Sequence, residues 1–317
     1  AAVLARADLC FSDLETAIRS PSVEAPTREG VFLHAADPAV LDVLEDLSIL
    51  LLATANNHVW DLGGGGIIGM LDELDRRGFA HAGAGADLAA AAAPAYRTTV
   101  GGTVALVAAA SGAIRPGAAA SPTRAGVNEL RRGGDGALHP ADLARILGAI
   151  AEAAAKADIV LAYHHNHILE ARGRRTPRWQ RDFAHLCIDA AASLYVSHGA
   201  PQLHGIEIYR GRPIFYDLGN LFFQTATAEG HYDEVAWQSV VAECRFEGGR
   251  FIDMILTPVQ LNPRSLGGAG DLATRGRPSI ATGAAACSIL DRLAELSRPL
   301  GTALERSGDT AIIRAPP

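Results

Sequence analysis

Short apolar runs alternate along the chain with segments whose apolar residues recur at helical spacing. The runs predict buried strands, and they lie at residues 9–11, 48–53, 104–108, 159–162, 194–196, 206–209 and 213–216. The helical spacing predicts helices at residues 39–46, after the glycine run 63–66, at 141–156, at 178–191 and near 284–297. Strands that alternate with helices are typical of an α/β fold.

Two turn signals and one change of composition refine this picture. Gly211-Arg212 predicts a hairpin between the strands at 206–209 and 213–216, and 247–249 predicts a second hairpin between 239–245 and 251–257. From 261 to 277 the chain is rich in Gly, Pro and Arg, which is typical of a linker or loop. We therefore expect a main domain over 1–261 and a C-terminal extension, 262–317, packed on it.

Three histidines follow the strand at 159–162, in the segment Tyr163-His164-His165-Asn166-His167. We expect them where the strand runs out into a loop, a usual place for a site on an α/β sheet. Alternate residues of an extended segment face the same way, so His165 and His167 should share one side and His164 the other. Imidazole suits metal binding and proton transfer, although solvated or hydrogen-bonded histidines would give the same pattern.

Composition and charge exclude several classes of function. The chain has 317 residues, 49% of them hydrophobic, and a net charge of -7, with its basic residues scattered; this argues against nucleic acid as the main partner. The four cysteines form no CxxC pair, which argues against a thiolate metal site or a disulfide framework. The densest basic stretch, Arg172 to Arg181, is either a solvated loop and helix start or an attractor of anionic substrate.

Polar constellations at the strand ends resemble a known family. They are Ala7–Glu15, Asn56-Asn57-His58 with Trp60–Gly63, His81–Gly85, Arg124–Asn128, the histidine cluster, Ser197-His198 and Gly205–Asn220. In this order they resemble the CapA family of poly-γ-glutamate capsule synthesis proteins, over Ala7 to about Leu261. The resemblance implies an α/β, metallophosphoesterase-like fold, which is a layered sandwich of two sheets flanked by helices.

The resemblance also implies a divalent metal ion of unknown identity and a set of site residues. Asn57 matches a carboxamide metal ligand, and His58 matches the neighbouring histidine that moves a proton, although Asn57 could instead cap a loop. The further metal ligands implied are Glu15, His165 and His198. Asp13 stands where the family usually carries Asn, so its carboxylate could ligate a metal or cap the following turn, and His204 is a further candidate ligand. The catalytic histidines implied are His58, His165 and His167.

The sequence departs from the family pattern in two places. The family's N-terminal strand, which ends in a Gly-Asp metal ligand, has no counterpart before Ala1, so an N-terminal signal or anchor and a contact with membrane-associated capsule machinery stay open. The family's second histidine after His198 is replaced by Gly199-Ala200, neither of which binds metal. His204 could substitute for it, or the metal site could be reduced or absent.

These observations predict a CapA-like, metal-dependent hydrolase or transferase that acts on an amino-acid polymer, a peptide or a related acyl substrate. A first alternative is a peptide epimerase of ribosomal peptide biosynthesis, which needs a base and an acid on opposite faces of a Cα. A second alternative is a noncatalytic protein that binds a polyanionic amino-acid polymer through the stretch from Arg172 to Arg181.

Overall fold

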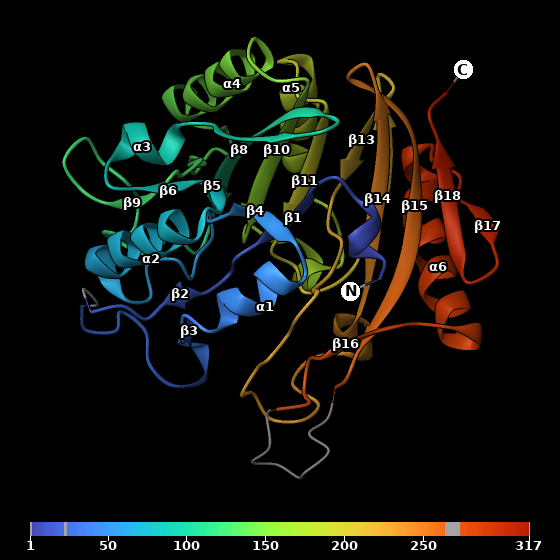
Figure 1. Cartoon of the computed structure of the whole chain (residues 1–317), viewed down its shortest axis with the longest axis horizontal. Helices are drawn as coiled ribbons and strands as arrows, with labels where there is room; N and C mark the ends of the chain where they lie inside the picture. The colour runs from blue at the N-terminus through green and yellow to red at the C-terminus, as the bar shows by residue number, and fades with distance from the viewer. Residues whose placement is uncertain (1, 22–23, 264–272, 317) are drawn as a thin grey trace. The chain divides into compact units, whose positions relative to one another are not determined.

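The computed structural model describes residues 2–21, 24–263 and 273–316, and in it the chain divides into two compact units (Figure 1). The first unit comprises Ala1–Ile168 with Asp189–Leu194, and the second comprises Leu169–Ile188 with Tyr195–Pro317. The division predicted from the sequence, 1–261 and 262–317, stays a prediction.

Two sheets form the centre of the first unit. The strands of one sheet are all parallel and run in the order β1 (Cys10–Asp13), β4 (Ile49–Ala53) and β5 (Ala80–Ala82). The other sheet joins β10 (Ile159–Asn166) in parallel to β8 (Gly102–Ser111), and β8 is antiparallel to β7 (Ala95–Thr99). β4 and β5 contact β8, so the two sheets pack against each other.

Helices cover these sheets. α1 (Val40–Asp46) contacts β4, α2 (Gly63–Arg77) contacts β5, and α4 (Pro140–Ala154) contacts β8 and β10. The short α3 (Leu88–Ala92) contacts α4 and β8. This arrangement confirms the predicted α/β sandwich of two sheets flanked by helices.

The helix after the glycine run shows why the apolar spacing was informative. Ile67, Met70 and Leu74 of α2 are fully buried, because residues three and four positions apart lie on one face of a helix. α2 ends at Arg77, where Gly78 takes a left-handed conformation with φ of 76°. A side chain with a Cβ rarely adopts that conformation, so the glycine marks the end of the helix.

Several short elements gave no pattern in the sequence. In the first unit they are β2 (Ala17–Ile18) paired with β3 (Ala35–Ala36), β6 (Ala84–Gly85) paired with β9 (Gly126–Val127), and the 3-10 turns η1 (Leu4–Arg6) and η2 (Gly30–Phe32). A strand of two residues is too short for alternation of polar and apolar side chains to show. The strands β5 and β7 were missed as well.

The second unit is built around two further groups of strands. The strands and 3-10 turns of this unit are β11 (Leu194–His198), β12 (Ile206–Tyr209), β13 (Arg212–Phe215), β14 (Gln238–Glu247), β15 (Arg250–Leu261), β16 (Pro278–Ile280), β17 (Glu305–Ser307), β18 (Thr310–Arg314), η3 (Ala171–Gly173), η4 (Glu234–Trp237) and η5 (Arg298–Leu300). β13 lies between β11, which is parallel to it, and β12, which is antiparallel. The turn between β12 and β13 is Arg210-Gly211, one residue earlier than predicted.

The predicted second hairpin is present as β14 and β15, which are longer than expected. β15 also pairs with β16 and β18, so the end of the chain joins this sheet. α6 (Gly283–Ser297) packs on β15 and β12, and α5 (Arg178–Asp189) contacts β11 through Phe183 and Tyr195. Part of the predicted linker at 261–277, residues 264–272, lies outside the described residues.

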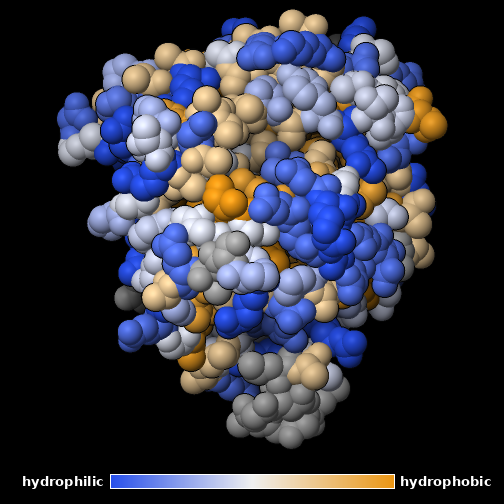
Figure 2. All heavy atoms as spheres, turned by 60° about the vertical axis from the view of Figure 1, so that its left-hand side comes forward, coloured by the Kyte–Doolittle hydropathy of each residue, from blue (hydrophilic) through white to orange (hydrophobic). Residues whose placement is uncertain are grey.

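The surface is mostly polar on the side of α2. Figure 2 brings that side forward and shows hydrophilic side chains over much of it, with apolar side chains in a few small groups. The large exposed apolar side chains of the first unit include Val31, Phe32 and Val43. Scattered exposure of this kind is ordinary for a folded protein. Within the described ranges, none of the helices has the length and hydropathy needed to cross a bilayer.

Candidate metal and acid-base site

The site of the first unit is assembled from the ends of three strands. Asp13 is the last residue of β1, and Asn57 and His58 follow β4, which is parallel to β1 and next to it. Carboxyl ends of neighbouring parallel strands meet at one edge of a sheet, which brings these side chains together. β10 of the other sheet contributes His165.

The strand β10 extends further than the sequence predicted. His164, His165 and Asn166 are paired with β8 inside the strand, and only His167 lies beyond its end. The expectation that the cluster begins a loop was therefore wrong, because the alanine-rich end of β8 gives it a partner strand. The predicted alternation is confirmed for His164, whose Nε2 lies 2.8 Å from Ser111 Oγ, away from the residues that His165 contacts.

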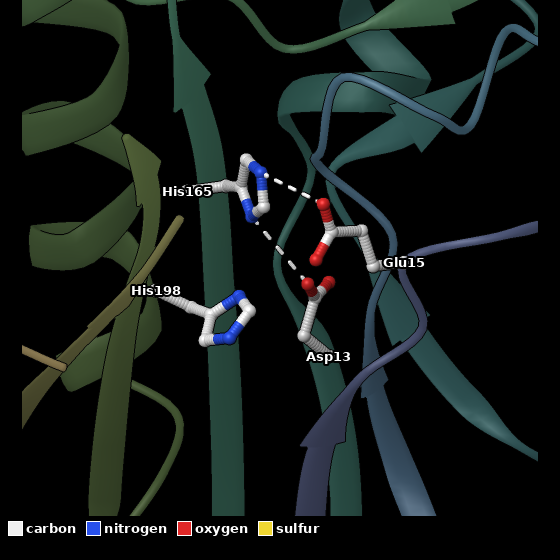
Figure 3. A group of neighbouring side chains, drawn as sticks. All are labelled: Asp13, Glu15, His165 and His198. Atoms are coloured by element: carbon white, nitrogen blue, oxygen red, sulfur yellow. Dashed lines mark ion pairs between the residues drawn. The ribbon is translucent and has the colours of Figure 1, made fainter. Parts of the chain in front are cut away.

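His165 pairs with two carboxylates. Its Nδ1 is 3.4 Å from Asp13 Oδ2 and its Nε2 is 3.5 Å from Glu15 Oε1. Figure 3 marks both ion pairs with dashed lines. One ligand atom from each of the three residues can be chosen so that all lie within 4.8 Å of one another. Two ligands of one ion, each about 2.0 to 2.2 Å from it, are at most about 4.4 Å apart. The three groups are therefore close to the spacing that a single ion requires.

The chemistry of these groups also fits a divalent ion. Two carboxylates and an imidazole lie close together, and Asn57 Oδ1 lies 2.8 Å from His165 Nε2. Burial is the main cause that lowers the pKa of His165 to about 3, and the Glu15 carboxylate opposes this shift. His165 is consequently neutral at neutral pH, the form in which imidazole binds metals. Carboxylate, carboxamide and imidazole together suit ions such as Mn²⁺, Zn²⁺ or Fe²⁺.

Asn56 fixes the loop that carries Asn57 and His58. Its Nδ2 donates to Asp13 Oδ1 at 3.2 Å and to the Leu14 carbonyl at 2.8 Å. Its Oδ1 accepts the backbone N–H groups of His58 and Val59. One buried carboxamide thus joins the end of β1 to the loop after β4. The loop is capped by Asn56, which leaves the side chain of Asn57 directed at His165.

The ring of His58 is oriented by a buried carboxylate. His58 Nδ1 lies 2.8 Å from Asp61 Oδ2, and its Nε2 lies 4.0 Å from Glu15 Oε1. Asp61 also accepts a hydrogen bond of 2.7 Å from Arg28 Nε. Because the carboxylate can only accept, His58 Nδ1 is the donor in this contact, and Nε2 is the ring nitrogen on the side of Glu15.

His167 reaches the same carboxylate from the end of β10. Its Nε2 is 4.0 Å from Glu15 Oε1, and its ring centroid is 5.0 Å from that of His165. This nitrogen is buried without a hydrogen-bond partner among the described residues. His165 and His167 therefore lie on the same side of the chain, as predicted. His167 is close to the proposed ligands but is not itself proposed as one.

The two predicted histidines of the second unit have partners inside that unit. His198 ends β11, and its Nε2 lies 3.2 Å from Asn220 Oδ1; its predicted role as a metal ligand stays a prediction. His204 Nε2 donates to the Gly173 carbonyl at 2.7 Å, and its Nδ1 is 3.2 Å from Thr176 Oγ1. Since both ring nitrogens of His204 are engaged, its contacts favour a structural role over the predicted metal-ligand role.

Four contributors to the site were not predicted from the sequence. They are Arg28, His34, Asp61 and Tyr163, whose hydroxyl lies 3.3 Å from His165 Nδ1. Asp61 could have been predicted, since a carboxylate three residues after a histidine can reach the histidine ring. Arg28 and His34 could not, because they come from a segment without regular apolar spacing.

The basic stretch of the second unit is partly free in solvent. Arg174, Arg175 and Arg178 are exposed, and Arg178 lies only 3.8 Å from Asp182 in a pair that is open to water. Arg181 Nη2 lies 3.8 Å from the largely buried Glu207. The side chain of Arg172 lies outside the described residues. An anion-binding role for this stretch stays a prediction.

Comparison with known proteins places the chain in a family. The family model of the bacterial capsule synthesis protein PGA_cap matches residues 1–225. An uncharacterized protein of Sinorhizobium fredii, y4sH, is 29% identical over 98% of this chain and 87% of its own length. The PGA biosynthesis protein CapA of Bacillus subtilis is 31% identical over 57% of this chain and 44% of its own length.

A solved phosphatase structure from Mycoplasma pneumoniae covers 87% of this chain and 82% of its own, with 11% identity and a TM-score of 0.40. A similarity of that size carries no argument about the reaction. The family match does cover β1, β4, β10 and β11, the strands that bear the predicted site residues. The chain therefore belongs to the PGA_cap family of bacterial capsule synthesis proteins.

Proposed function

We propose that this protein is a metal-dependent hydrolase or transferase that acts on an amino-acid polymer, a peptide or a related acyl substrate. The observation that carries the proposal is the position of His58, oriented by Asp61, beside a carboxylate that also approaches His165. The Glu15 carboxylate thus lies near both the proposed proton-transfer residue, His58, and the proposed metal ligand His165.

The residues of the first unit divide between two tasks in this proposal. Asp13, Glu15, Asn57 and His165 would hold a divalent ion, which would supply a polarised carbonyl or an activated water. His198 is proposed as a further ligand on the sequence resemblance alone. His58 Nε2 carries the lone pair, so His58 accepts a proton from the attacking group and returns it to the leaving group. His167 can take part in the same transfer from the end of β10.

The name of a relative supports a proposal for the substrate class. CapA of Bacillus subtilis is named for PGA biosynthesis, and we propose a γ-glutamyl polymer or a peptide of similar backbone for this chain. The carbonyl of an amide linkage is the group that a divalent ion polarises. A carboxylate-rich substrate also brings further oxygen atoms that suit such an ion.

Epimerisation of a peptide is a second candidate, and one contact favours it. The Nε2 atoms of His58 and His167 each lie 4.0 Å from Glu15 Oε1, so two imidazoles approach one small region. One could remove a Cα proton while the other donates a proton to the opposite face, with no bond to water formed. The net reaction would change neither the mass nor the connectivity of the peptide.

Isotope incorporation separates these functions. The chain would be incubated with oligo-γ-glutamate and, separately, with a linear peptide, each with Mn²⁺, Zn²⁺ or Mg²⁺. Hydrolysis places ¹⁸O from H₂¹⁸O in a new carboxylate, and transfer makes a new amide without ¹⁸O. Epimerisation introduces deuterium from D₂O at unchanged chain length. Absence of all three products with both substrates, although they bind, would refute an enzymatic function of either kind and leave binding alone.

A further inference from the structure

Both backbone polar groups of His34 are hydrogen-bonded. Its N–H donates to Asp61 Oδ2 at 2.9 Å, and its carbonyl accepts the N–H of Ala17 at 3.0 Å. Its ring Nδ1 lies 3.4 Å from the carbonyl oxygen of Glu15. The residue lies between η2 and β3, and β3 pairs with β2 directly after it. Its imidazole is therefore fixed to a rigid part of the first unit.

The ring of His34 covers one face of His58. The two imidazole centroids are 3.6 Å apart, and the ring planes are inclined by only 10°. Asp61 Oδ2 receives both the His58 Nδ1 contact of 2.8 Å and the His34 backbone N–H. Burial, followed by the nearby His58, lowers the pKa of His34. The nearly parallel rings form a stacked pair.

A hydrogen bond to one ring atom leaves the imidazole free to turn about that contact. Asp61 fixes the Nδ1 edge of His58, but a second restraint is needed to fix the plane of the ring. The stacked ring of His34 supplies a restraint of that kind, because rotation of His58 would collide with it. Together the two contacts fix an edge and a face of the ring, whose Nε2 lies 4.0 Å from Glu15 Oε1.

We propose that His34 is a positioning residue, which holds the plane of the His58 imidazole so that Nε2 faces the Glu15 side of the site. The inference rests on the proposed function, in which His58 moves a proton. Proton transfer requires hydrogen-bond reach, and a displacement of about 1 Å in an active site can cost about 10²-fold in rate. His34 acts only through His58 and is not assigned a contact with substrate.

Two substitutions of His34 distinguish the effect of its stacked ring from the effect of its ring nitrogens. His34→Phe keeps a flat ring over His58 and loses the nitrogen near the Glu15 carbonyl, whereas His34→Ala loses both. Neither changes the backbone N–H that Asp61 accepts. Asp61→Asn is the contrasting variant, because it replaces the acceptor that sets the tautomer of His58. His81→Ala is the matched control, since His81 pairs with Asp75 elsewhere in the first unit.

The main readout is the order and the tautomer of the His58 ring in histidine-labelled full-length protein with Mg²⁺, measured by ¹³C relaxation and long-range ¹H–¹⁵N spectra. We expect His34→Ala to lower the order of the His58 ring and His34→Phe to restore it. Asp61→Asn should instead change the tautomer ratio, and His81→Ala should change neither. Unaltered order in His34→Ala, or equal loss of order in His34→Phe, would overturn the proposal.

An activity readout distinguishes this inference from the proposed function. With oligo-γ-glutamate as the probe, His34→Ala should lower kcat by about 10 to 10²-fold with KM changed less than about 2-fold, and His34→Phe should recover most of kcat. If wild-type protein shows no turnover of any probe, the proposed function fails, while the ring-order measurement still decides the role of His34. If KM alone rises in His34→Ala, the residue contacts substrate and the positioning role is refuted.

Discussion

Asp61 Oδ2 lies 2.8 Å from His58 Nδ1, and this contact decides which ring nitrogen of His58 is available for chemistry. The same carboxylate is held by Arg28 and by the backbone N–H of His34, so it is a fixed acceptor. A fixed acceptor on Nδ1 leaves the Nε2 lone pair on the side of Glu15. The proposed acid-base group, His58, and the proposed metal ligands thereby meet at Glu15.

Substitution of His58 should lower both activity and stability, and activity much more. His58→Ala should lower turnover by about 10² to 10⁴-fold, the usual contribution of a positioned acid or base. His58 is also buried and donates to Asp61, so its loss should lower the free energy of unfolding by about 1 to 2 kcal/mol.

The loss of stability should be limited because Arg28 and the His34 N–H still satisfy Asp61. Calorimetry and turnover of the same preparation test this expectation. His81→Ala should leave turnover unchanged. An inactive His58→Ala protein that is also largely unfolded at 25 °C would show that the histidine is chiefly structural.

The proposed ion should depend on Glu15 for its affinity. Glu15→Gln removes one charge from the group formed with Asp13 and His165, and we expect the affinity for Mn²⁺ to fall by at least about 10-fold. Isothermal titration calorimetry measures this change directly. Glu73→Gln is the matched control, because Glu73 pairs with Arg76 and Arg77 on α2. Equal affinities in wild type and Glu15→Gln would remove Glu15 from the ligand set.

Removal of the ion should destabilise the fold by mass action. A ligand at 100 times its Kd stabilises the native state by about 2.7 kcal/mol, so EDTA should lower the melting temperature of wild-type protein. The effect of EDTA should be smaller in Glu15→Gln than in Glu73→Gln. A melting temperature that is insensitive to both Mn²⁺ and EDTA would argue against a bound ion.

The sequence predicted those parts of the fold and site that lie on regular elements. β4, α2 and β10 have long apolar patterns, so their ends, and with them Asn57, His58 and His165, could be placed at one edge. The extent of β10 could not be predicted, since histidines carry no strand signal and the pairing with β8 is a long-range contact. Tertiary pairing overrides local preference in such a segment.

The residues that orient His58 were harder to predict for a different reason. Arg28 and His34 reach the site from a segment of turns and two-residue strands, whose course is set by contacts with Asp61 and Ala17. His204 shows a related limit. Nothing in the sequence indicated that its ring nitrogens contact the Gly173 carbonyl and Thr176 Oγ1, and its role as a metal ligand stays a prediction.

The buried Asp142 gives a prediction about pH and stability that is independent of the site. Burial raises the pKa of Asp142, but hydrogen bonds from Arg131 and Arg145 outweigh this and lower it to about 2 from the model-peptide value of 3.8. A lowered pKa in the native state means that the carboxylate contributes stability above about pH 4. This contribution is lost as the pH falls toward 2, because the unfolded chain takes up the proton first.

Asp142→Asn should therefore cost about 2 kcal/mol at pH 7. The difference in unfolding free energy between wild type and variant should shrink between pH 4 and pH 2. Urea denaturation at several pH values measures it. Asp253→Asn is a comparison, because Asp253 also pairs with an arginine, Arg245, but in a more exposed place where screening weakens the pair. A difference that stays constant with pH would contradict the ion-pair explanation.

The exposed arginines before and within α5 are predicted to bind a polyanionic amino-acid polymer. Arg174, Arg175 and Arg178 are open to solvent, so a flexible chain of carboxylates can approach all three without displacing a buried partner. Each exposed pair contributes up to about 1 kcal/mol, and replacement of all three by Gln should weaken binding of poly-γ-glutamate by about 10-fold. Salt screens such contacts, so the deficit should diminish as ionic strength rises.

A control with the same loss of charge distinguishes a specific patch from net charge. Arg298, Arg306 and Arg314 are also exposed in the second unit, and their replacement by Gln changes the charge by the same amount. Fluorescence anisotropy with labelled poly-γ-glutamate at several salt concentrations compares the two triple variants. Weakening confined to the 174, 175 and 178 variant supports a polymer-binding surface at α5. Equal weakening in both variants would mean that the polymer responds only to overall charge, and the basic stretch would then be a solvated helix start.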